Sequence, residues 1–308
     1  MHAASTATLT AAQIAQAITA AHQAAFASFP PQAAPALPAD RAQDAVYTGA
    51  LAACSTLGFI AIDADCLASA WSAQSARTGQ FDAQAWPTQA ADFGLLTSGG
   101  PQAFAPCPQQ LGLYAVLPTA EWVGRMARAG VPTVQLRFKS DDAQAIAAEI
   151  DAAVAAVEGS GALLFINDHW RQAIAAGSYG VHLGQEDLDA LSAAELAELR
   201  ASGVRLGVST HGYAEMVRAS QAQPSYIAMG AVFPTTLKKM ATVPQGLARL
   251  ERYAALTRSY PQVAIGGISA AEFPQVRESG VGSIAVVRAI VNADNPEAAA
   301  ADLMALMG

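Results

Sequence analysis

The feature that most constrains the fold is a regular alternation of strand-like and helix-like runs that begins at Leu111. Apolar, β-prone runs predict eight strands, at residues 113–117, 133–138, 163–167, 180–183, 205–209, 226–232, 263–266 and 283–287. Each is followed by a helical pattern, at residues 119–129, 142–157, 169–176, 193–202, 213–222, 246–257, 270–279 and 295–307. Eight such units predict an α/β fold, a closed (β/α)8 TIM barrel. The rival is a doubly wound open sheet, which the lack of a GxGxxG motif after the first strand disfavours.

The residues before this alternation have a different character. Residues 1–108 are predicted to form an Ala-rich helical extension, and residues 109–308 the barrel. Within the extension we expect one helix in residues 1–30, a proline-rich linker over 30–38 and two helices at 46–57 and 64–71. The extension has no grouping of catalytic residue types, so a structural role is expected for it.

Composition narrows the possible partners. The chain of 308 residues is 53% hydrophobic and carries a net charge of −8, and it has no basic patch that would favour nucleic acid. It has no apolar run of membrane-spanning length and no signal-peptide pattern. The three cysteines lack metal-ligand spacing, which fits a reducing cytoplasm. A homo-oligomer is compatible with these properties.

The second predicted strand places cations inside the barrel. Gln135, Arg137 and Lys139 alternate with apolar residues and therefore share one face. The apolar face should meet the helices, so the polar face should point inward. Buried cations need an anion, which favours a bound ligand over the alternative of an internal salt-bridge network.

Acidic and amide side chains follow the third and fourth strands. Asn167 and Asp168 end one, and Asp187 follows the next. Carboxylates at neighbouring strand ends suit Mg²⁺, although each Asp could equally cap the helix after it. Ser209 ends the fifth strand. A zinc site of His169, His182 and His211 is disfavoured because His182 lies within its strand and fits a hydrogen-bonded core histidine better.

The sixth strand leads into a polar loop with two hydroxyls and two of the three lysines in the chain. Thr235, Thr236 and Lys238 there suggest an anion site, against the alternative of a solvated loop. Gly267 after strand seven, with Val287 at the end of strand eight and Arg288 after it, suggests a backbone phosphate cup, although a tight turn would also use the glycines. A diphosphate substrate and a monophosphate substrate would explain two anion sites on one rim.

Six motifs, in order, resemble the thiamine phosphate synthase family over residues 111–307: QLRFK at 135–139, IND at 166–168, GVHLGQED at 180–187, GVSTH at 207–211, GAVFPTTLKK at 230–239 and AIGGI at 264–268. The resemblance implies a TIM barrel that joins 4-amino-2-methyl-5-hydroxymethylpyrimidine diphosphate to a thiazole phosphate, with thiamine phosphate and pyrophosphate as products. No covalent nucleophile is then needed.

The family motifs also imply site roles. The pyrimidine diphosphate would be held by Gln135, Arg137, Lys139, Asn167, Ser209 and Lys238, of which Arg137, Ser209 and Lys238 would also be catalytic. Mg²⁺, the implied cofactor, would bind Asp168 and Asp187. The thiazole phosphate would be surrounded by Thr235, Thr236, Gly267, Val287 and Arg288.

The chain departs from the usual family pattern at Phe138, His169, Leu237 and Arg288. The last two lie on the thiazole side, where Arg288 could strengthen phosphate binding or block the cup. Three alternatives are open: a thiazole tautomerase that shares the barrel, a non-catalytic binder of thiamine precursors, and a general barrel isomerase of phosphosugars, for which no acid/base carboxylate pair is evident outside the metal site. A thiazole tautomerase would need no residues that bind a diphosphate, and a non-catalytic binder of thiamine precursors would need no pair of metal-binding carboxylates.

Overall fold

The computed structural model describes residues 9–235 and 243–307. The chain divides into two compact units, Met1–Leu95 and Leu96–Gly308. The expected boundary at residue 108 and this division differ by the segment 96–108. No helix among the described residues is long and apolar enough to cross a membrane.

The first unit is helical where the structure describes it. It contains helices α1 (Ala11–His22), α2 (Ala45–Thr56) and α3 (Ala61–Thr78), with 3-10 turns η1 (Ala39–Arg41) and η2 (Ala90–Phe93). Thr10 and Gln13 form a capping box that starts α1. Gly79, at φ 77°, ends α3 in the left-handed conformation that glycine adopts without strain.

Helix α1 is shorter than the helix expected within residues 1–30. It ends at His22 because the chain turns there and places Phe26 in the core of the unit. The Phe26 ring lies 5.2 Å from that of Phe59 and 5.3 Å from that of Trp86. This aromatic cluster, rather than helix propensity, fixes where the first helix stops.

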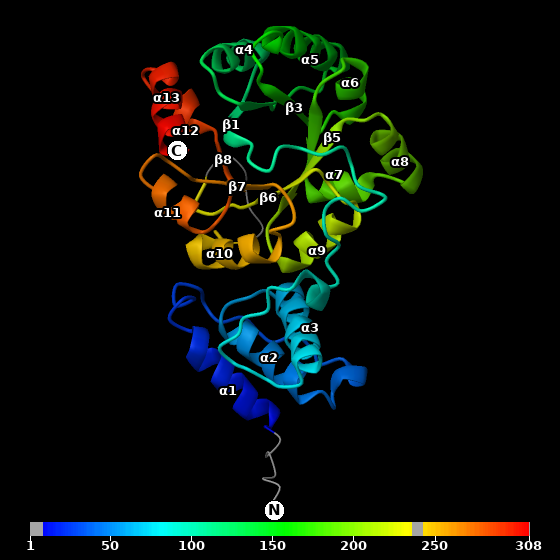
Figure 1. The fold of residues 1–308 in the computed structure, drawn as a ribbon, viewed down its shortest axis with the longest axis vertical. Coiled ribbons are helices and arrows are strands. Elements are labelled where there is room, and N and C mark those ends of the chain that lie inside the picture. Colours follow the sequence, from blue (N-terminus) through cyan, green and yellow to red (C-terminus); the bar gives the residue numbers. More distant parts are fainter. Residues whose placement is uncertain (1–8, 236–242, 308) are drawn as a thin grey trace, which may run out of the picture. The chain divides into compact units, whose positions relative to one another are not determined.

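The second unit is the predicted closed barrel (Figure 1), with all neighbouring strands parallel in the order β1 to β8. The strands are β1 (Gly112–Leu117), β2 (Thr133–Leu136), β3 (Leu163–Asn167), β4 (Gly180–Leu183), β5 (Arg205–Thr210), β6 (Tyr226–Met229), β7 (Gln262–Ile265) and β8 (Ser283–Val286). The helices are α4 (Ala120–Arg128), α5 (Ala143–Val157), α6 (Trp170–Ala175), α7 (Gln185–Ala190), α8 (Ala193–Ala201), α9 (Tyr213–Gln221), α10 (Gly246–Leu256), α11 (Phe273–Glu278), α12 (Arg288–Val291) and α13 (Pro296–Met307). The strands are almost wholly buried, as expected for a parallel sheet closed on itself and covered by helices.

Two strands end two or more residues earlier than predicted. Strand β2 stops at Leu136 and β6 at Met229, although apolar residues continue beyond both. After β6 the chain keeps irregular contact with the end of β7: Val232 N–H donates to Ile265 C=O at 3.0 Å and Phe233 N–H to Gly266 C=O at 2.9 Å. These segments form the rim of the barrel rather than its wall.

Helix α7 was not predicted. The last strand is followed by the short helix α12. Helix α7 is short and polar, so it shows no apolar periodicity. Gly184 is its N-cap residue, and the Gly184 backbone N–H donates to the Asp187 carboxylate at 3.1 Å.

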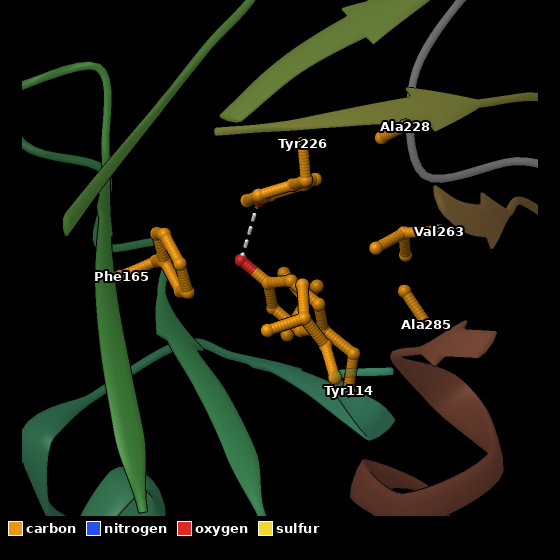
Figure 2. Close-up of a cluster of buried hydrophobic side chains, with 8 residues drawn as sticks. Tyr114, Phe165, Tyr226, Ala228, Val263 and Ala285 are labelled. Carbon is orange, nitrogen blue, oxygen red and sulfur yellow. Dashed lines mark hydrogen bonds between the residues drawn. The ribbon is translucent and has the colours of Figure 1, made fainter. Parts of the chain in front are cut away.

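The barrel interior is filled by aromatic rings opposite small residues (Figure 2). Tyr114, Phe165 and Tyr226 are buried, with the Phe165 and Tyr226 ring centroids 5.2 Å apart. Gly207 is paired with Tyr226 across β5 and β6, and a Cβ atom on Gly207 would lie 2.1 Å from the Tyr226 ring. Glycine at that position therefore makes room for the tyrosine.

Residues 96–110 contact the N-terminal ends of the strands. Tyr260 Oη donates to Leu96 C=O at 2.8 Å, Phe104 N–H to Gln223 C=O at 3.0 Å, and Ser225 Oγ to Ala105 C=O at 2.6 Å. Because Ser225 and Tyr260 immediately precede β6 and β7, this segment covers the end of the barrel opposite to the predicted site. We call residues 96–108 the floor segment.

Candidate active site

The predicted site residues that the structure describes lie at or just beyond the C-terminal ends of the strands. Gln135 is in β2 and Asn167 ends β3, while Ser209 lies at the penultimate position of β5. The remaining members are in the loops or helices that follow strands: Arg137, Lys139, Asp168, Asp187, Thr235, Gly267, Val287 and Arg288. Thr236 and Lys238, and also Leu237, lie outside the described residues.

Strands β2 and β3 bring two amides together. Gln135 is buried, and its Nε2 donates to Asn167 Oδ1 at 2.8 Å. Arg137 follows the end of β2, and its N–H still bonds Leu117 C=O at 2.8 Å. Lys139 is exposed in the loop beyond. The predicted polar face thus begins in the barrel wall and ends in solvent at the rim.

The two carboxylates predicted to bind metal face each other. Asp168 has φ 63°, an uncommon value for a non-glycine residue, and its N–H donates to His182 C=O at 3.0 Å. Partial desolvation of its carboxylate raises the pKa of Asp168, and the neighbouring charge of Asp187 raises it further. His169 and Arg137 act in the opposite direction on this pKa.

This pair fits a hard divalent cation. Two carboxylates that repel each other supply oxygen ligands at one point, and a cation there would relieve the repulsion. Among the described residues, no group of three or more His, Cys, Asp or Glu side chains is arranged to enclose a metal. A site of two carboxylates leaves room for water and phosphate oxygens, which is the arrangement Mg²⁺ prefers.

Ser209 is held from two sides. Its Oγ lies 2.8 Å from His182 Nε2, and its backbone C=O accepts from Gln185 Nε2 at 2.6 Å. Gln185 Oε1 in turn accepts from Arg218 Nε at 2.8 Å. His182 is buried with both ring nitrogens near hydroxyls, so the prediction of a hydrogen-bonded core histidine is confirmed.

The glycine pair after β7 lies against the loop after β6. Both Gly266 and Gly267 have positive φ, and a Cβ on Gly267 would lie 2.6 Å from Pro234 C=O. Glycine is therefore required for this close approach, next to Thr235. Val287 precedes α12, where its C=O accepts from Ile290 N–H at 3.1 Å, and Arg288 is exposed in the first turn.

Three residues below the site were not singled out from the sequence as neighbours of it. Tyr114, Tyr226 and His182 join Gln135 to Ser209 through hydrogen bonds. The available signal was strand alternation: Tyr114 and Tyr226 stand at inward positions of β1 and β6. A further pair at the rim, His211 and Glu215, is linked at 2.7 Å. Burial raises the pKa of Glu215, but the side-chain and backbone hydrogen bonds from His211 and the electrostatic attraction of His211 and Arg218 together lower it.

Comparison with known proteins places this geometry in a family. The family model described as thiamine monophosphate synthase matches residues 113–290. A thiamine-phosphate synthase of Neisseria meningitidis serogroup B is 53% identical over 203 residues, which cover 66% of this chain and 98% of that protein. The chain belongs to the thiamine monophosphate synthase family.

Other relatives agree with this assignment. The thiamine-phosphate synthase of Escherichia coli O6:H1 is 50% identical over 205 residues, covering 67% of this chain and 96% of that protein. The solved thiamine phosphate pyrophosphorylase of Pyrococcus furiosus is 27% identical, with a TM-score of 0.57, and covers 64% of this chain and 95% of that chain. The family match starts at Leu113, so it includes the barrel strands and excludes the helical unit.

Proposed function

We propose that the barrel joins 4-amino-2-methyl-5-hydroxymethylpyrimidine diphosphate to thiazole phosphate, releasing thiamine phosphate and pyrophosphate. One observation carries this proposal: a barrel of the thiamine monophosphate synthase family has facing carboxylates after β3 and β4 and a glycine-formed close approach between the loops after β6 and β7. These features lie on the same rim and suit a diphosphate and a monophosphate respectively.

On the diphosphate side, Arg137 and Lys139 supply positive charge at the end of β2, and Gln135 and Asn167 supply fixed amides. Lys238, which lies outside the described residues, joins them through the family motif. Mg²⁺ at Asp168 and Asp187 would neutralise charge on the diphosphate when bound. The exposed positions of Lys139 and of both aspartates support access by a charged ligand.

On the thiazole side, the family motifs assign Thr235, Gly267, Val287 and Arg288 to the monophosphate. Thr236, which lies outside the described residues, joins them through the same motif. The backbone after β7 and β8 offers N–H groups, and Arg288 is exposed at the start of α12. The free cysteines fit a reducing cytoplasm as the place of this reaction.

The reaction is a substitution at the exocyclic carbon of the pyrimidine. The C–O bond to the diphosphate breaks, and both electrons leave with pyrophosphate. The aminopyrimidine stabilises the cation that remains, and the thiazole nitrogen lone pair then forms the new C–N bond, which leaves the positive charge on the thiazolium. Arg137 and Lys238 stabilise the departing charge, while the amides and Ser209 hold the pyrimidine in line. No side-chain nucleophile and no net proton transfer are required.

The test is a reaction of the purified chain with both substrates and Mg²⁺. We expect thiamine phosphate only when both substrates and Mg²⁺ are present, and its absence under these conditions refutes the proposal. A tautomerase would act on the thiazole alone, which a parallel reaction without the pyrimidine diphosphate detects. Asp168 and Asp187 would have no role as metal ligands in a tautomerase.

A further inference from the structure

A continuous chain of hydrogen bonds crosses the barrel interior beneath the rim. It runs from Asn167 Oδ1 to Gln135 Nε2 at 2.8 Å, from Gln135 Oε1 to Tyr114 Oη at 3.0 Å, and from there to Tyr226 Oη at 2.9 Å. It continues to His182 Nδ1 at 2.7 Å and from His182 Nε2 to Ser209 Oγ at 2.8 Å. Its two ends are side chains proposed to contact the pyrimidine diphosphate. We call Tyr114, Tyr226 and His182 the interior relay.

The amide of Gln135 sets the direction of every bond in this chain. Its Oε1 can only accept, so Tyr114 donates to it and must accept from Tyr226. Tyr226 has then used its proton, so it accepts from His182 Nδ1–H. When the imidazole is neutral, its proton is therefore on Nδ1, and Nε2 accepts from the Ser209 hydroxyl.

The consequence is a defined donor and acceptor pattern at the rim. Ser209 uses its proton toward His182 and so presents oxygen lone pairs to a ligand. Asn167 uses Oδ1 toward Gln135 and so presents its amide N–H groups. A polar ligand edge with one donor and one acceptor is matched by this pattern, whereas an edge of acceptors alone is not.

The relay is packed so that it cannot easily rearrange. Tyr114 and Tyr226 are buried with ring centroids 6.0 Å apart, and Phe165 packs against both. Figure 2 shows the two hydroxyls directed toward each other between these rings. The His182 ring is stacked at 24° on that of Tyr226. Burial also raises the pKa of both phenols, which keeps their protons available as donors at neutral pH.

We propose that Tyr114, Tyr226 and His182 are positioning residues that lock Gln135, Asn167 and Ser209 in one orientation for the pyrimidine substrate. The inference rests on the proposed function in taking those three residues as substrate contacts. Loss of one relay hydroxyl frees the Gln135 amide and the Ser209 hydroxyl to turn, which misaligns the reacting carbon.

The kinetic test is Tyr226→Phe, compared with Tyr260→Phe. Both changes delete one buried tyrosine hydroxyl, but Tyr260 Oη bonds Leu96 C=O at the floor of the barrel. We expect Tyr226→Phe to raise the KM for the pyrimidine diphosphate about tenfold and to leave the KM for thiazole phosphate within about twofold. Tyr260→Phe should leave both constants near wild type. Equal kinetic effects of the two variants, or wild-type kinetics in Tyr226→Phe, overturn the proposal.

A second readout does not depend on activity. In ¹⁵N-histidine NMR of the intact protein, the His182 signal, identified as the one lost in His182→Gln, should show the neutral tautomer protonated at Nδ1. It should change in Tyr226→Phe and not in Tyr260→Phe. A tautomer protonated at Nε2 contradicts the relay even if the protein makes thiamine phosphate, while the expected tautomer in an inactive protein refutes only the proposed function.

Discussion

At the scale of single residues, the Asp168 carboxylate, which faces Asp187, is expected to support activity and to lower the stability of the folded protein. Because the pKa of Asp168 is raised in the folded metal-free protein, ionisation of this carboxyl reduces folding stability as pH rises above the ordinary pKa of an aspartate. Asp168→Asn should therefore raise the Tm at pH 7 in the presence of a chelator. The same change should lower kcat/KM at saturating Mg²⁺ by about 100-fold or more, since the charge that would hold the metal is lost. Thermal unfolding and steady-state kinetics on one preparation check both signs, and a parallel fall in Tm and activity would support a purely structural aspartate.

For Arg288, the direction in which the KM for thiazole phosphate changes on mutation distinguishes a side chain that binds the phosphate from one that crowds the cup. It is exposed in the first turn of α12, and we propose that it contacts the thiazole phosphate. Arg288→Ser should then raise the KM for thiazole phosphate about tenfold through loss of a charge-assisted hydrogen bond. Arg277→Ser, on α11, removes an exposed arginine that bonds Leu306 C=O and serves as the control. A lower KM in Arg288→Ser would show that the side chain crowds the cup.

At the scale of elements, Gly207 shows how strand pairing supports the site. Gly207→Ala would place a methyl group 2.1 Å from the Tyr226 ring, so we expect a loss of about 1–3 kcal/mol in the free energy of unfolding. Gly282→Ala is the control, because its nearest neighbouring atoms are at an ordinary 3.4 Å. Urea denaturation measures both, and equal stabilities would mean that Tyr226 moves aside without cost.

The strands of the barrel also show which features could be predicted from the sequence and which could not. The positions of the strands could be predicted because strand periodicity is a local pattern. The rim residues could be predicted because parallel strands in a barrel all end at one face. The Tyr114–Tyr226 contact could not be predicted, since it joins the non-adjacent strands β1 and β6 across the barrel. The pairing of Gly207 with Tyr226 could not be predicted either, because it depends on the register between the neighbouring strands β5 and β6. Helix α7 was missed because it is too short and polar for a periodic pattern.

At the scale of the whole molecule, the floor segment determines where the barrel begins. We propose that the helical unit is dispensable for catalysis and that residues 96–108 are not. A chain starting at Leu96 should keep kcat/KM within about twofold of the full chain. A chain starting at Gln109 loses the bonds to Gln223 and Ser225 and the buried Phe104 side chain. It should be less stable by about 2–5 kcal/mol. Equal stability of the two truncated proteins in urea would refute a role for the floor segment.

The proposed substitution forms two products together. The most direct measurement is the amount of thiamine phosphate and of pyrophosphate released by the full chain from the pyrimidine diphosphate and thiazole phosphate, with Mg²⁺ and with chelator. We predict equimolar products that require Mg²⁺ and both substrates. Pyrophosphate release without thiamine phosphate, or no release of either, would show that the chain does not catalyse this substitution.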